Sequence, residues 1–192
     1  MNDEELIWDV YHNSIITDSF DHKNIKVLNQ YLKKFYGDSR IVFTNKEEID
    51  NINIKQTEKS PTINRKPKGL WYSLGNEWAD FLKFDAANWA SSYSSVFVLD
   101  LNFRKILKID TPEKLIVFDK NHSRGDDYVD WAVLQRLGYS GVEIIPYRGE
   151  SRYSMSWYNG WDVASGCIWN SDCIIKSTKI FPRTKKLNSN HE

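Results

Sequence analysis

Apolar residues in the first part of the chain recur at helical spacing. Four of them are three or four positions apart and would lie on one face of a helix that Gly37 ends: Ile25, Leu28, Leu32 and Phe35. We expect residues 1–40 to form a helical N-terminal extension whose stripe contributes to the core. The run Arg40-Ile41-Val42-Phe43-Thr44 is β-branched and aromatic, which predicts a strand.

The middle of the chain alternates between polar and apolar blocks. Residues 51–68 are polar, contain Pro61 and Pro67 and have no sustained period, which predicts a long surface loop. The apolar blocks that follow predict a strand, a helix and two further strands: 69–73, 76–90, 95–101 and 105–109.

The second half continues with the same mixture of elements. Pro112 just inside a cap position predicts a helix start, and a helical pattern returns over 127–137. We expect strands over 139–146, 158–168 and 173–180, and a polar tail over 183–192. At 192 residues, these elements fit one α+β domain spanning 1–192.

Composition narrows the class of partner. Lysine plus arginine equals aspartate plus glutamate at 26 each, so no excess positive field favours duplex DNA or an anionic membrane. The chain is rich in aromatic residues, with eight tryptophans and ten tyrosines. A tryptophan-rich core explains them, and so does a pocket that stacks flat rings.

The number and spacing of cysteines and histidines, together with the hydropathy of the chain, indicate where the protein is located and whether it binds a metal. The two cysteines, Cys167 and Cys173, are too few for a disulfide scaffold and lack the spacing of a zinc site. The four histidines are not spaced as a helical metal site, so we expect no metal. No stretch approaches 18 apolar residues, and the acidic start is unlike a signal peptide. We therefore expect a cytoplasmic protein in a reducing compartment, without a membrane partner.

Three segments combine aromatic and polar residues in a way that could carry chemistry. They are 66–73, the strand around Glu143 and 161–169. The sequence Gly69-Leu70-Trp71-Tyr72-Ser73 resembles the Gly, aliphatic, Tyr, aromatic, small strand of the ADP-ribosyltransferase superfamily, which contains the poly-ADP-ribose polymerases and bacterial ADP-ribosylating toxins. Glu143 is similar in position to the family's final glutamate.

The resemblance covers roughly residues 40–180 in order of elements. The family's first-strand His-Gly or Arg-Gly pair has no counterpart at Thr44-Asn45, and the rival match at 10–13 lacks the glycine. What the resemblance implies is an α+β fold of two packed, mixed or antiparallel sheets that form a central cleft with flanking helices.

The same resemblance implies a function and a site. The chain would be a monomeric transferase that takes NAD as its substrate and passes ADP-ribose to a protein or nucleic-acid acceptor. Glu143 would be the catalytic carboxylate that stabilises the ribosyl cation. The NAD site would be lined by Thr44, Gly69, Trp71, Tyr72 and Ser73.

Other interpretations stay open on the sequence alone. Glu143 could face solvent or pair with Arg148 or Arg152, and Trp71 could belong to the core. The chain could also be a non-catalytic module that binds single-stranded nucleic acid or a peptide in an aromatic groove. The tryptophans of that groove would be Trp71, Trp78, Trp89, Trp157, Trp161 and Trp169. A third possibility is an enzyme fold that has lost activity and acts through a partner surface.

Overall fold

A computed structural model describes residues 22–49, 51–56, 65–124 and 128–181 of the chain. The predicted start of the N-terminal extension, the rival match at 10–13, residues 57–64 of the predicted polar loop and the C-terminal tail lie outside these residues.

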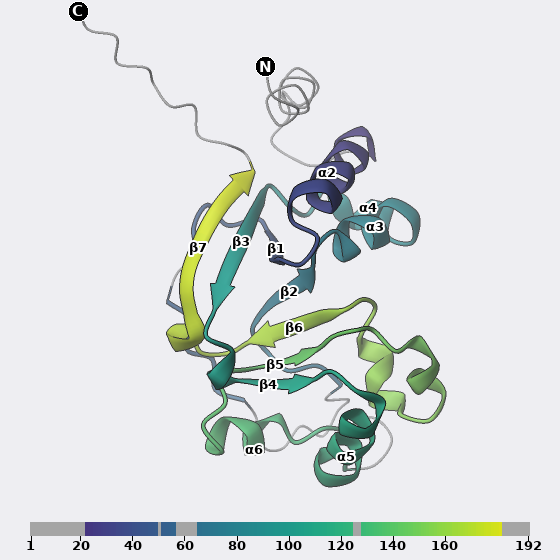
Figure 1. Cartoon of the computed structure of the whole chain (residues 1–192), viewed down its shortest axis with the longest axis vertical. Coiled ribbons are helices and arrows are strands. Elements are labelled where there is room, and N and C mark those ends of the chain that lie inside the picture. Colours follow the sequence, from purple (N-terminus) through teal and green to yellow (C-terminus); the bar gives the residue numbers. More distant parts are fainter. Residues whose placement is uncertain (1–21, 50, 57–64, 125–127, 182–192) are drawn as a thin grey trace, which may run out of the picture.

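The architecture is built on one seven-stranded sheet in the order β4-β5-β6-β2-β1-β3-β7 (Figure 1). Its strands are β1 Arg40–Thr44, β2 Leu70–Leu74, β3 Ser95–Leu101, β4 Ile106–Ile109, β5 Gly141–Ile144, β6 Ser165–Ile168 and β7 Ile174–Phe181. Only the β4–β5 pair is parallel, and the other neighbours are antiparallel. The α+β class predicted from the sequence is confirmed.

The sheet is strongly curled. In Figure 1, β3 and β7 run along the long axis of the molecule, whereas β4, β5 and β6 run across it. Strand β2 joins the two halves, because it pairs with β1 on one side and with β6 on the other. A single continuous sheet thus stands where two separate sheets were expected.

Helices and 3-10 turns flank both halves of the sheet. The helices are α2 His22–Phe35, α3 Glu77–Phe84, α4 Ala87–Ala90, α5 Pro112–His122 and α6 Trp131–Arg136. The 3-10 turns are Phe103–Lys105, Gly149–Tyr153, Ser156–Gly160 and Ser171–Cys173. Figure 1 shows α2, α3 and α4 beside β1 and β2, and α5 and α6 below β4.

Most predicted elements are present, and tertiary packing alters several boundaries. The helix expected over 76–90 is divided in two, because buried Ala86 takes a non-helical conformation with φ −139° and ψ 41°. The segment expected to be extended from Tyr158 begins as a 3-10 turn and becomes strand only at Ser165. The helix expected over 127–137 is confined to α6.

Two apolar clusters pack on one face of the sheet. The predicted stripe of α2 enters the first: Ile25, Leu28 and Leu32 are each at most 1% exposed and pack with β1, β3 and α3. The described part of the expected N-terminal extension therefore belongs to the core. The second cluster lies under α5 and α6. A third cluster around Val42, Tyr72 and Phe97 occupies the other face.

Tryptophan supplies much of the second cluster. Trp131, Trp157, Trp161 and Trp169 are at most 1% exposed, and two of their indole groups are anchored. Trp157 Nε1 donates to Asp119 at 2.7 Å and Trp169 Nε1 donates to the Tyr139 carbonyl at 2.6 Å. The core explanation of the aromatic surplus is confirmed for these four residues.

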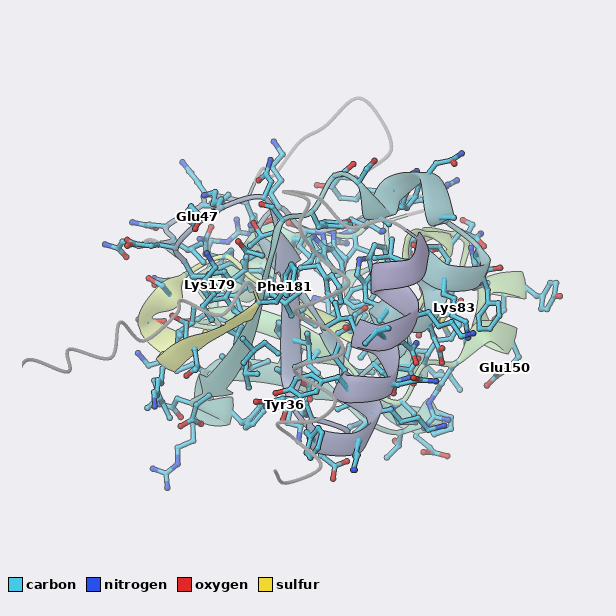
Figure 2. The ribbon with its side chains drawn as sticks, turned by 90° about the horizontal axis from the view of Figure 1, so that it is seen from above. Tyr36, Glu47, Lys83, Glu150, Lys179 and Phe181 are labelled. Carbon is cyan, nitrogen blue, oxygen red and sulfur yellow. The ribbon has the colours of Figure 1, made fainter. Side chains whose placement is uncertain are left out.

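The edge strand β7 is held by an ion pair as well as by its backbone hydrogen bonds to β3. Figure 2 shows Lys179 of β7 and Glu47, which follows β1, on the same side of the molecule, where they form an ion pair. Within the described segments, no helix has both the length and the apolar character needed to cross a bilayer.

Candidate functional site

A cavity of about 210 Å³ opens beside the middle of the sheet, on the face that carries the two apolar clusters. Its walls come from β1, β2, α3 and the segment that leads into β6. The lining residues are Ile41, Phe43, Lys66, Trp71, Tyr72, Ser73, Trp78, Tyr93, Gly160, Trp161, Asp162, Val163 and Ser165.

Indole rings form much of the wall. Trp71 meets Trp161 edge to face, with ring centroids 4.9 Å apart, and the Lys66 ammonium lies 5.2 Å from the Trp71 ring centroid. On the α3 side, Trp78 stacks on Phe81 at 5.0 Å. Rigid aromatic walls of this kind suit a flat ring, because stacking and edge contacts are made with little loss of side-chain freedom.

Two serines lie next to each other on the floor of the cavity. Ser73 of β2 is directly opposite Ser165 of β6 in the antiparallel register, so both side chains are on one face. The Ser165 hydroxyl donates to the Val163 carbonyl at 2.9 Å. The buried Ser73 hydroxyl has no hydrogen-bond partner among the described residues. Such an orphaned hydroxyl costs stability, and it is free to form a hydrogen bond with a ligand in the cavity.

Asp162 is the only carboxylate among the described residues that line the cavity. It is 22% exposed and is flanked by two cations. Lys66 Nζ is 3.5 Å from Oδ2, and Arg152 Nη2 is 4.0 Å from Oδ1. Both distances exceed those of charge-assisted hydrogen bonds, so neither cation is tightly committed to Asp162.

Glu143 is placed elsewhere, in a buried ion pair. Its side chain is 1% exposed and accepts two hydrogen bonds from Arg40, from Nε and from Nη2, each 2.9 Å long. The Tyr72 hydroxyl donates to the same carboxylate at 3.1 Å. The partner of Glu143 is therefore Arg40, and not Arg148 or Arg152 as the alternative interpretation had it.

A glycine makes this contact across three strands possible. Gly166 of β6 pairs with Tyr72 on one side and with Glu143 on the other. A Cβ at Gly166 would lie 2.4 Å from the Tyr72 ring. The tyrosine therefore crosses β6 only because position 166 has no side chain.

The contacts with Glu143 raise the pKa values of Tyr72 and Arg40. Burial, reinforced by the negative charge of Glu143, raises the pKa of Tyr72 well above its ordinary value, so this hydroxyl remains a donor. Burial opposes the charge of Arg40, but the hydrogen bond and charge of Glu143 outweigh it, and the pKa of Arg40 is raised. Arg40 is a fixed cation in this setting.

The strand alternation separates Glu143 from the cavity. Its neighbours Val142 and Ile144 belong to the cluster that Trp71 and Trp161 contact, so Glu143 points to the opposite face of the sheet. Tyr72 likewise alternates with Trp71 and Ser73 along β2. The catalytic carboxylate and the aromatic wall predicted for one cleft thus do not converge.

Some of the remaining predicted site residues line the cavity and others do not. Trp71 and Ser73 line the cavity; Tyr72 is also among its lining residues, but its side chain extends to Glu143 on the other face of the sheet. Thr44 and Gly69 are not among the lining residues. Thr44 accepts a hydrogen bond from the Lys46 amide, and Gly69 packs closely against β6. Lys66 and Asp162 were present in the aromatic and polar segments singled out in the sequence, but their meeting across 96 positions has no sequence signal.

The tryptophans proposed for an open binding groove do not form one surface. Trp157 and Trp169 are core residues, and Trp161 belongs to the core and also lines the cavity with Trp71 and Trp78. Trp89 is 52% exposed on α4.

Both cysteines are free and buried. No group of three or more metal-binding side chains occurs among the residues described. No protein-family model, curated protein or solved structure matches this chain.

Proposed function

We propose that the chain binds NAD in the cavity beside β2 and transfers its ADP-ribose group to an acceptor. The observation that carries the proposal is the composition of the cavity. Its aromatic wall belongs to Trp71, on the strand that resembles the ADP-ribosyltransferases, and a carboxylate, Asp162, lies in the same lining.

The nicotinamide ring is the part of NAD that fits this space. It is flat and cationic when attached to ribose, and both properties favour contact with the indole faces of Trp71 and Trp161. The Ser73 hydroxyl on the cavity floor has no hydrogen-bond partner among the described residues, and rotation about its side-chain bond would offer it to the ring's amide.

The carboxylate of the reaction is then Asp162 in place of Glu143. The bond between nicotinamide and the ribose C1′ breaks, and nicotinamide leaves with the electron pair. A carboxylate beside the ribose stabilises the cation that develops, and the acceptor's nucleophile bonds to C1′ and loses a proton. Asp162 lines the cavity where this charge would form, whereas Glu143 is paired with Arg40 on the opposite face of the sheet. The catalytic role of Glu143 stays a prediction from the sequence.

The fold proposal follows the same resemblance. We identify the β1–β3–β7 half of the curled sheet and the β4–β5–β6 half with the two packed sheets of an ADP-ribosyltransferase, joined here through β2. The cavity supports this proposal because its lining residues come from both halves: Ile41 and Phe43 from β1, and Ser165 from β6.

Ligand binding and chemistry are tested separately. NAD should raise the melting temperature, with a stabilisation of about 2.7 kcal/mol at a hundredfold excess over its dissociation constant. Trp71→Leu should weaken this shift. Asp162→Asn should retain the shift but lower NAD cleavage by about a hundredfold or more, as loss of one preorganised electrostatic group does.

Asp110→Asn is the matched control, because Asp110 is an exposed carboxylate paired with Lys114 outside the cavity. It should leave both readouts unchanged. Absence of a thermal shift with millimolar NAD, together with a shift on a single-stranded oligonucleotide, would replace the proposal by the binding-module alternative.

A further inference from the structure

We propose that Lys66 and Arg152 form an anion subsite at the mouth of the cavity, which holds a phosphate of the nucleotide whose ring fills the interior. This inference rests on the proposed function for the identity of the ring, but its phosphate part can be tested with any nucleotide.

Lys66 is held in place by its carbon stem as well as by its charge. The stem crosses Gly160, where a Cβ would come within 2.9 Å of the Lys66 Cγ. The ammonium then lies over the Trp71 ring and 3.5 Å from Asp162, while the side chain remains 44% exposed. A lysine oriented by packing and still open to solvent can exchange a loose carboxylate contact for a phosphate oxygen.

Arg152 is oriented by neutral groups. Its Nε donates to the Asn159 side chain at 3.1 Å, Nη2 to the Asn159 carbonyl at 3.2 Å, and Nη1 to the Tyr147 hydroxyl at 3.1 Å. These contacts use three of the five guanidinium N–H groups, and among the described residues the other two have no acceptor. The planar fork is preorganised, and within the described segments its one ion-pair partner is Asp162, at 4.0 Å.

The local charge favours an anion. Lys66 and Arg152 approach the two oxygens of one carboxylate, so these three groups together carry a net positive charge. A phosphate bridging both cations would gain charge-assisted hydrogen bonds and relieve that imbalance. The subsite adjoins the cavity directly, because Lys66, Gly160 and Asp162 all line it.

The experiment compares ligands that differ by one phosphate. Isothermal titration of the full chain should show nicotinamide mononucleotide binding about tenfold more tightly than nicotinamide riboside, the ratio expected for one phosphate contact. Lys66→Gln and Arg152→Gln should each reduce this ratio to about threefold or less, and added salt should reduce it in the wild type. Lys114→Gln, which removes an exposed lysine with its own partner Asp110, should keep the full ratio.

Adenosine and its monophosphate, titrated in parallel, separate the two proposals. Equal binding of riboside and mononucleotide would overturn the subsite and leave the proposed function standing. A preference for adenosine monophosphate that both variants lose, without binding of either nicotinamide compound, would support the subsite and overturn the proposed function. A full phosphate preference in both Gln variants, or no binding of any of the four ligands, would overturn the subsite.

Discussion

Replacing Glu143 by glutamine distinguishes a structural carboxylate from a catalytic one. The change keeps the size of the side chain but removes the charge that pairs with Arg40, and it leaves the guanidinium facing a neutral amide in a largely buried site. Removing one partner of a fully buried ion pair costs about 3–5 kcal/mol. Because Arg40 is 17% exposed and can recruit water, we expect a loss of about 2–4 kcal/mol in the free energy of unfolding.

Urea denaturation and thermal melting measure this loss directly. For a chain of this length, the expected destabilisation lowers the melting temperature by about 4–16 °C. In a double-mutant cycle with Arg40→Gln, the double variant should be less destabilised than the sum of the single variants by about 1–3 kcal/mol. Asp110→Asn, at an exposed pair, should change stability by less than about 0.5 kcal/mol.

The refuting result is equally specific. If Glu143→Gln kept the wild-type midpoint while NAD cleavage fell a hundredfold, Glu143 would act in the reaction and the assignment of that role to Asp162 would be wrong. Loss of stability with residual cleavage in the folded fraction would agree with an ion pair that positions Tyr72 and β2.

Three further perturbations test the site and its surroundings. Ser73→Ala should raise the free energy of unfolding by about 1 kcal/mol in urea melts, because it removes a buried hydroxyl that lacks a partner. Ser165→Ala should lower the free energy of unfolding by about 1 kcal/mol, because that hydroxyl donates to the Val163 carbonyl. Equal effects of the same sign in the two variants would contradict this prediction. Gly166→Ala should lower the free energy of unfolding by about 3 kcal/mol or more, because the added methyl would meet the Tyr72 ring at 2.4 Å and the Val142 carbonyl at 2.7 Å. A wild-type denaturation midpoint would show that β6 can move away from its neighbours β2 and β5 without loss of stability. Burial lowers the pKa of His122, so the unfolded chain binds a proton there at a higher pH than the folded chain does, and stability should fall as pH drops below about 6.5. In chemical denaturation, a His122→Gln variant should show a flatter dependence of stability on pH. An unchanged slope in this variant would exclude His122 as the source of the pH dependence.

The sequence by itself determined the local elements that a simple period can specify. The three-and-four spacing from Ile25 to Phe35 requires an apolar helix face, and the β-branched runs at β1 and β3 favour extended backbone. It also singled out β2, whose Trp71 and Ser73 do line the cavity. These are properties of neighbouring residues, so they are readable without the fold.

The tertiary structure decided which side chains meet. Glu143 pairs with Arg40, 103 positions away in the sequence, and Lys66 pairs with Asp162, 96 positions away. No local sequence pattern encodes either pairing. Because side chains alternate along a strand, consecutive residues point to opposite faces of the sheet: Trp71 faces the cavity and Tyr72 faces Glu143. A one-residue difference in register exchanges the two faces of a strand, so the order of motifs along the chain suggested a site, but only the strand register determined that Glu143 lies on the face opposite Trp71 and Ser73.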